Sequence, residues 1–323
     1  MIRRIETLLG ALLSALLASA SVWADPLPQA DALGWLQRIS TAARQLNYAG
    51  TVIYQQGDSV ETYRLVHLLE GSNEIERLET LDGPRREILR TNDVVYSYQA
   101  DSRTFRMERR RPGRSFPQVL PEQLSMVTDH YHVRKGDVER VAEHDAQALI
   151  LEPKDGLRYG HKLWADTASG LLLKAKMFGE RAQTVEQFAF TQVQVGGSIA
   201  RQLLQPSVPL PSGAPPDAGE SSAADSDWVL RSPPAGFRKV VEVRRAKETG
   251  SSVQVTHMVL SDGLAAVSVF IEPARQKVAE RLVQRGAIYI YTRMLGDQRI
   301  TVLGEAPAAT VINIAQGLAP RGR

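Results

Sequence analysis

The sequence contains no cysteine. A disulfide framework, a thiolate metal site and a thiol nucleophile are therefore excluded, and so is lipid attachment through a cysteine after a signal sequence. A strong charge of one sign is lacking as well, because the formal net charge is only +3 over 323 residues. A balance so close to zero does not indicate a protein that binds nucleic acid.

Long apolar runs are also absent. The longest one, Leu8 to Ala20, is shorter than the ~20 residues that a membrane-spanning helix needs. It follows Arg3 and Arg4 and is succeeded by small residues up to Ala24, which is the pattern of a secretory signal. We expect cleavage before Asp25, a soluble periplasmic product and no lipid anchor. Because the signal carries two arginines and one glutamate, its removal lowers the net charge from +3 to +2.

Proline is concentrated in one stretch. Five prolines lie between Leu203 and Asp227, and most other residues there are Gly, Ser, Ala and Asp. Such a segment buries too little apolar surface to offset the entropy lost on ordering, so it predicts an extended, semi-rigid linker. Core-forming sequence resumes on both sides. The predicted organisation is a signal peptide at 1–24, a large β domain at 25–202, a linker at 203–227 and a smaller α+β domain at 228–323.

The large domain combines a helical pattern with a long series of strands. Apolar residues recur at spacings of three and four from Trp35 to Leu46, and the period changes to two from Tyr48 onward. Turn signals such as Asp82-Gly83-Pro84 separate short β-rich runs roughly every ten residues, which indicates an antiparallel meander. A second helix is expected from Pro121 to Thr128, with proline in its first turn. We predict a large curved sheet whose concave face is covered by helices.

The smaller domain shows the same alternation. Short runs such as Ala266–Phe270 and Ile300–Val302 predict strands. The chain closes on an expected helix from Pro307 to Leu318, because proline stands near its start and Gly317 near its end. The pattern indicates a compact α+β unit.

Residue patterns for catalysis or metal binding are scarce. His130 and His132 would share one face of a strand, but no third ligand is identifiable, and a solvated strand face is the better interpretation. Ser198 lacks the nucleophile elbow, and no phosphate-binding loop or dinucleotide fingerprint is present. Glu76 and Glu79 are interpreted as surface charges. We expect a binding protein rather than an enzyme, without cofactor or metal, and keep an undetected envelope hydrolase as a remote alternative.

Arginine is clustered between Arg103 and Arg114, where six arginines face a single glutamate. One interpretation is a solvated hairpin and loop; the other is a surface that contacts anions. Guanidinium groups bind phosphate and carboxylate in a bidentate manner, which suits lipid phosphates or an acidic partner segment. The candidate anionic or partner contacts are Arg85, Arg86, Arg109, Arg110 and Arg111.

Several short blocks occur in an order that resembles one known family. The blocks are Asn47-Tyr48-Ala49-Gly50-Thr51, Leu81-Asp82-Gly83-Pro84-Arg85-Arg86-Glu87, Tyr159, Leu163-Trp164-Ala165-Asp166, Gly170-Leu171-Leu172-Leu173-Lys174, Glu186-Gln187-Phe188-Ala189-Phe190, Pro234-Ala235-Gly236-Phe237, Ser261-Asp262-Gly263-Leu264 and Val302-Leu303-Gly304-Glu305-Ala306-Pro307. Together they resemble the RseB/MucB family of periplasmic regulators of the sigma-E (AlgU-type) envelope stress response. The blocks span nearly the whole chain after the signal. The arginine cluster is not one of them.

The resemblance implies a fold and a function. It implies an α+β protein with an amino-terminal half-open antiparallel β-barrel capped by helices, similar to the lipoprotein carriers, and a smaller antiparallel sheet with a helix. It implies a negative regulator that binds the periplasmic part of an RseA/MucA-type membrane anti-sigma factor and protects it from regulated proteolysis. A lipid or lipopolysaccharide-type ligand would release the partner, and members self-associate into homo-oligomers. The alternative function is a periplasmic lipid or lipoprotein carrier.

Two surfaces follow from this expected function. The partner would bind a groove between the two domains, and the lipid would enter a cavity on the concave face of the first. The side chains that would line this cavity are also the expected hydrophobic core of such a sheet, and core is the better interpretation. The lipid-pocket candidates are Tyr159, Leu163, Leu173, Met177, Phe188 and Phe190.

Overall fold

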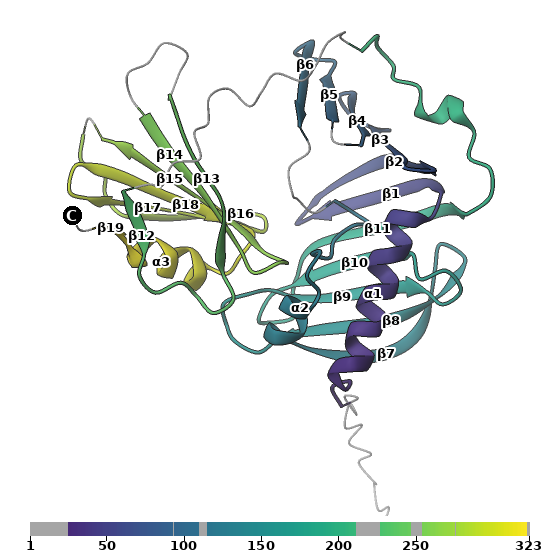
Figure 1. Ribbon diagram of the computed structural model, residues 1–323, viewed down its shortest axis with the longest axis horizontal. Helices are drawn as coiled ribbons and strands as arrows, with labels where there is room; N and C mark the ends of the chain where they lie inside the picture. Colours follow the sequence, from purple (N-terminus) through teal and green to yellow (C-terminus); the bar gives the residue numbers. More distant parts are fainter. Residues whose placement is uncertain are drawn as a thin grey trace, which may run out of the picture.

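The computed structural model describes residues 25–92, 94–109, 115–210, 227–246, 254–274 and 276–321. The signal peptide expected at 1–24 lies outside the described residues. No helix within the described part is long and apolar enough to span a bilayer. The chain forms two domains, each with its own sheet and its own helical cover (Figure 1).

The first domain is built on one antiparallel sheet. Within the described residues its strand order is β6-β5-β4-β3-β2-β1-β11-β10-β9-β8-β7. The strands are β1 (Tyr48–Gln56), β2 (Ser59–Glu70), β3 (Asn73–Thr80), β4 (Arg86–Thr91), β5 (Val94–Gln99), β6 (Thr104–Arg109), β7 (Tyr131–Val141), β8 (His144–Pro153), β9 (Gly160–Asp166), β10 (Leu172–Phe178) and β11 (Thr184–Val195). Consecutive strands pair with each other, except β6 and β7, and β1 also pairs with β11, which joins the two halves of the meander.

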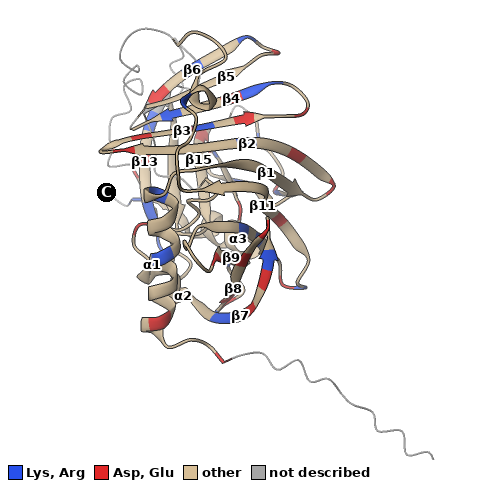
Figure 2. Ribbon diagram, turned by 90° about the vertical axis from the view of Figure 1, so that its right-hand side faces the viewer, with Lys and Arg blue, Asp and Glu red and all other residues tan. Residues whose placement is uncertain are grey.

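This sheet curves but does not close. Its edges, β6 and β7, are not paired with each other. Two helices lie on the inner face: α1 (Gln29–Gln45) and the short α2 (Ser125–His130) (Figures 1 and 2). The expected half-open antiparallel barrel with capping helices is thus confirmed. The second expected helix is displaced toward the carboxyl end, because residues 121–124 form a non-helical approach and the first helical residue is Ser125.

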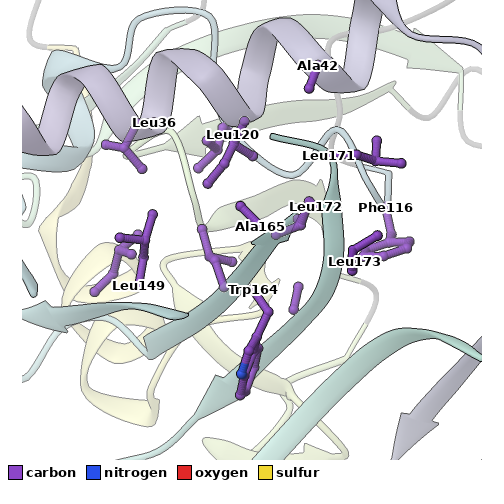
Figure 3. Close-up of a cluster of buried hydrophobic side chains, with 14 of the residues drawn as sticks. Leu36, Ala42, Phe116, Leu120, Leu149, Trp164, Ala165, Leu171, Leu172 and Leu173 are labelled. Atoms are coloured by element: carbon purple, nitrogen blue, oxygen red, sulfur yellow. The ribbon is translucent and has the colours of Figure 1, made fainter. Parts of the chain in front are cut away.

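The core of the first domain forms between α1 and the inner face. The apolar stripe of α1 is buried there, with Leu36 and Ile39 fully covered. Figure 3 shows Leu36 and Ala42 projecting from α1 toward the buried side chains of the sheet and of the loop that carries Leu120. On β10 the expected alternation is confirmed, since Leu173, Ala175 and Met177 are buried whereas the two intervening lysines are partly exposed.

The outer face of the sheet is also covered in part. Ile199 and Leu204 pack against Val66 of β2, around the 3₁₀ turn η1 (Arg201–Leu204). Arg77 donates a hydrogen bond from Nη1 to the carbonyl oxygen of Leu203 at 3.1 Å. The backbone N–H of Ser207 donates to both carboxylate oxygens of Glu87 at 3.1 Å. Residues 203–207, which the composition assigns to the linker, are therefore fixed to the first domain.

The second domain is a smaller antiparallel sheet with one helix, as expected. Its larger sheet has the order β13-β14-β15-β18-β17-β16 within the described residues, and β12 pairs with β19 beside it. Its elements are β12 (Trp228–Leu230), β13 (Arg238–Ala246), β14 (Gln254–Ser261), β15 (Ala266–Pro273), β16 (Arg281–Arg285), β17 (Ile288–Leu295), β18 (Gln298–Gly304), α3 (Ala308–Gly317) and β19 (Leu318–Pro320). The helix α3 begins directly after Pro307 and buries Val311 and Ile314 against the sheet.

Candidate functional site

One arginine of the first domain lies at the centre of the contact between the domains. Arg158, between β8 and β9, has a fully buried side chain. Its guanidinium donates from Nη1 to Oδ2 of Asp262 in the second domain at 2.7 Å, and from Nη2 to the carbonyl oxygen of Ala235 at 2.6 Å. The same group lies over the rings of Tyr131 and Phe237, 5.9 and 5.6 Å from their centroids. A single buried cation thus binds two separate segments of the second domain.

The charge of Arg158 is balanced by two carboxylates. Asp155 receives a bidentate pair of hydrogen bonds from Nε and Nη2, each 2.9 Å long. Burial alone would raise the pKa of the Asp155 carboxyl, but hydrogen bonds from Arg158 and from the N–H of Leu157 lower it below its usual value. Asp262 supplies the second carboxylate with its side chain fully buried. Buried charges are tolerated only when paired and hydrogen-bonded, and this cluster meets that condition.

Further contacts surround this ion pair. The carbonyl oxygen of Leu157, the residue before Arg158, accepts a hydrogen bond from Thr310 Oγ1 in the first turn of α3. Tyr159 Oη donates to the carbonyl oxygen of Ala287 at 3.3 Å, and burial raises the pKa of this tyrosine to about 12. Arg238 Nη2 donates to Gln123 Oε1 at 3.1 Å. The two domains therefore meet through several specific polar contacts.

Two glycines permit the close approach of the domains. Gly236 has φ +80°, and a Cβ there would lie 2.2 Å from Nε2 of His130. Gly263 has φ +98°, and a Cβ there would lie 3.1 Å from Pro121 Cγ. Both positions combine a left-handed backbone with a neighbour from the other domain, which is where only glycine fits without strain. Both belong to sequence blocks on which the family resemblance rests.

An apolar cavity lies on the inner face of the first sheet, next to this contact. The cavity is lined by Val119, Leu120, Leu151, His161, Leu163, Ala175, Lys176, Met177, Glu186, Phe188 and Leu264. Ten of these residues come from the first domain, and Leu264 comes from the second. Its volume is about 30 Å³, which is room for only two or three water molecules, since one water needs roughly 10–15 Å³. An acyl chain does not fit this arrangement.

The structure divides the lipid-pocket candidates into two groups. Leu163, Met177 and Phe188 line the cavity. Leu173 and Phe190 are buried in the core of the first domain instead, with exposed fractions of 0% and 2%. Tyr159 lies outside the cavity and packs with Met177 and Ala287 at the contact between the domains.

Within the described residues, the arginine candidates do not form one cluster. Arg85 is half-exposed and pairs with Glu79, with Nη2 2.8 Å from Oε1. Arg86 begins β4 and is exposed. Arg109 ends β6, the edge strand of the sheet. Arg110 and Arg111 lie outside the described residues.

Two interpretations of charged and polar residues were wrong. His130 is the last residue of α2 rather than part of a strand, so it does not share a strand face with His132 and packs against Gly236 instead. Glu76 and Glu79 are buried rather than on the surface, with exposed fractions of 3% and 8%. Each is paired with an arginine, Glu76 with Arg90 and Glu79 with Arg77. The described residues contain no cluster of three or more side chains that is suited to a metal ion.

Sequence reasoning missed Arg158, Asp262 and Leu264 as members of a site. Asp262-Gly263 is recognisable as a tight turn, and Leu264 directly after it is an apolar residue in a loop. An apolar residue directly after a tight turn was the available sign that this loop packs against another part of the protein. It did not reveal that the loop contacts Arg158, 104 residues away in the sequence, because such a contact leaves no local periodicity.

Comparison with known proteins covers both domains. The family model of the MucB/RseB N-terminal domain matches residues 31–208, and that of the MucB/RseB C-terminal domain matches residues 222–319. The first match ends just after Ser207, in agreement with the packing of residues 203–207 on the first sheet.

Individual relatives match over nearly the full length. The sigma factor AlgU regulatory protein MucB of Pseudomonas aeruginosa is 33% identical, over 95% of this chain and 97% of the relative. The sigma-E factor regulatory protein RseB of Escherichia coli K12 is 26% identical, over 91% of this chain and 92% of the relative. A crystal structure of MucB in complex with MucA(peri) is 28% identical and covers 91% of this chain and 100% of that chain, with a TM-score of 0.73. On these matches, the chain belongs to the MucB/RseB family.

Proposed function

We propose that this protein is a periplasmic negative regulator of a sigma-E-type (AlgU-type) stress response. It binds the periplasmic part of a MucA-type membrane anti-sigma factor, protects that segment from regulated proteolysis, and gives it up when an envelope lipid binds. The protein acts by binding and not by catalysis.

The observation that carries the proposal is the match to MucB structures determined with MucA. The complex structure of Pseudomonas aeruginosa MucA/MucB is 29% identical, covers 91% of this chain and has a TM-score of 0.74. The similarity includes both domains, so the scaffold that meets MucA in those structures is present here as a whole. A regulator that needs two domains in one arrangement also accounts for the buried Arg158–Asp262 ion pair that joins them.

For the partner surface, we propose the region between the domains. Arg238 and Lys239 at the start of edge strand β13 are exposed, and the free edge of the first sheet ends in Arg109. Exposed strand edges offer unpaired backbone groups to an added segment, and basic side chains favour an acidic one. Arg85, Arg86 and Arg109–Arg111 remain proposed contacts for acidic partner residues or lipid phosphates.

For the lipid, we propose the cavity on the inner face of the first sheet, in an opened form larger than the about 30 Å³ of this arrangement. Its lining is mainly aliphatic and aromatic, which suits an acyl chain and offers little to a polar ligand. The side chain of Lys176 at the lining is available to meet an anionic headgroup.

The experiment that tests the regulator is a protection assay. The purified mature protein is mixed with the periplasmic segment of its MucA-type partner and with the protease that begins degradation of that partner. We expect the segment to survive in proportion to the amount of protein added, with an exposed-surface variant such as Glu143→Gln as a matched control. Degradation at the same rate with and without the protein contradicts the proposal. We also propose that the protein self-associates, as the family resemblance implies. Sedimentation of the mature protein tests this.

A lipid or lipoprotein carrier is the second candidate, and the apolar cavity favours it. A carrier accepts and delivers its cargo without a protein partner. The carrier function would be supported, and the regulator function contradicted, if the protein transferred a bound lipoprotein between two membranes and failed to protect the partner segment.

A further inference from the structure

Leu264 belongs to the second domain by sequence and to the first by packing. It lies in the β14–β15 loop, residues 262–265, between two strands of the second sheet. Its exposed fraction is 3%, and its neighbours are the core residues of the first domain. In the cavity it lies with Leu120, Leu163 and Met177. One leucine of the second domain therefore completes the wall of a cavity in the first.

Asp262 holds this loop in shape and in place. Its Oδ1 accepts hydrogen bonds from the backbone N–H groups of Leu264 at 3.0 Å and Ala265 at 2.6 Å. Its Oδ2 accepts the 2.7 Å bond from Arg158. The carboxylate that orients Leu264 is thus the same one that binds the first domain, so the position of Leu264 and the docking of the domains are coupled.

The loop is closely packed, with Asp262 and Leu264 only 1% and 3% exposed, and there is little room for a side chain at Gly263 between them. A Cβ on Gly263 would lie 3.3 Å from Pro121 Cβ and 3.5 Å from Met126 Cβ. Close-packed contacts of this kind are discrete and do not deform gradually. Withdrawal of Leu264 from the cavity therefore requires the second domain to move away as a body.

We propose that Leu264 is a plug: the docked second domain seals the cavity, and an acyl chain enters only after the Arg158–Asp262 contact opens. This inference rests on the proposed lipid role of the cavity and adds its regulation. A ligand that binds only the undocked form shifts the population toward that form, and its apparent affinity is reduced by the fraction of molecules that are open. Lipid binding and the docked arrangement then exclude each other.

The absence of native cysteine permits a direct test. Met126→Cys combined with Gly263→Cys places two Cβ atoms about 3.5 Å apart, within the range of roughly 3.5–4.5 Å that disulfides adopt. Oxidation locks the domains and reduction releases them in the same polypeptide, so any strain from replacing Gly263 is present in both states. The probe is cis-parinaric acid, a fluorescent fatty acid.

We expect the oxidised protein to bind the probe at least tenfold more weakly than the reduced protein. Arg158→Lys keeps the charge but loses the bidentate geometry, and we expect it to bind the probe about tenfold more tightly than the unmodified chain. Arg201→Lys, at the exposed ion pair with Glu70, is the matched control and leaves the affinity unchanged. Equal affinities in the oxidised and reduced forms overturn the plug.

The outcomes separate the plug from the lipid role. If the unmodified, reduced and Arg158→Lys proteins all fail to bind the probe, the lipid role of the cavity is wrong, and the plug falls with it. If they bind and the oxidised form binds equally well, only the plug is wrong. A second readout needs no variant: the amides of Leu264 and Ala265 should exchange hydrogen faster when the probe is added, and unchanged exchange on binding contradicts the proposal.

Discussion

Arg158 and Asp262 form an ion pair 2.7 Å long between two domains, with both side chains fully buried. They are 104 residues apart in the chain. The pair lies beside the apolar cavity, and the loop that carries Asp262 also carries Leu264. The Arg158–Asp262 ion pair that joins the domains and the Leu264 side chain that lines the cavity are therefore parts of one contact.

Asp262→Asn should weaken docking without unfolding the loop. The amide oxygen can still accept the N–H groups of Leu264 and Ala265, but Arg158 loses one of its two anionic partners. Removing one member of a buried pair costs about 3–5 kcal/mol, and the hydrogen bonds that Arg158 still donates to Asp155 favour the lower end. Denaturant unfolding measures the loss. Glu70→Gln, at the exposed pair with Arg201, is the control and should change the free energy of unfolding by less than about 1 kcal/mol.

Leu264→Ala should destabilise the docked form as a core substitution does, although Leu264 lies in a loop. Truncating a buried leucine costs about 2–5 kcal/mol, because apolar burial is lost and a cavity remains. Leu282→Ala in the same domain is the control, since Leu282 is 42% exposed and such surface changes stay within about 0.5 kcal/mol. Equal effects of the two substitutions on urea unfolding would show that Leu264 is not packed as described.

Gly236→Ala should separate the domains. The new Cβ would lie 2.2 Å from Nε2 of His130 in the other domain. Gly296→Ala is the matched control: it also has positive φ, at +62°, but no atom lies within 4 Å of the Cβ position. Both variants bear the left-handed strain of roughly 1–2 kcal/mol, and only the first creates the clash. Small-angle scattering should show a larger radius of gyration for Gly236→Ala alone. Identical scattering from the two variants would contradict the contact.

The attachment of residues 203–207 to the first sheet should depend on pH through Glu87. Burial alone would raise the pKa of Glu87, but hydrogen bonds from Arg77 and Ser207 lower it below its usual 4.5. Because the folded pKa is depressed, the stabilisation is present above pH 4.5 and is lost as the pH falls through the folded pKa. The difference in free energy of unfolding between the unmodified chain and Glu87→Gln should therefore be largest near neutral pH and shrink in acid. Denaturant unfolding of Glu87→Gln and of the unmodified chain at a series of pH values measures this difference.

Local features of the fold were predictable from the sequence, and non-local ones were not. The Asp82-Gly83 turn and the alternation of Leu173, Ala175 and Met177 are set by backbone geometry and side-chain period, and both are confirmed. The burial of Glu76 and Glu79 depends on arginines of other strands and was missed. For the site, the sequence indicated an aliphatic and aromatic lining. It did not indicate that only Leu163, Met177 and Phe188 of the six candidates line the cavity. That choice depends on where the second domain docks.

The central claim is that both domains together bind and protect a MucA-type periplasmic segment. The most direct measurement is the rate at which the protease degrades that segment with and without a saturating amount of the mature protein. The account predicts that the unmodified protein slows degradation strongly. Degradation at the unprotected rate with the unmodified protein would contradict it.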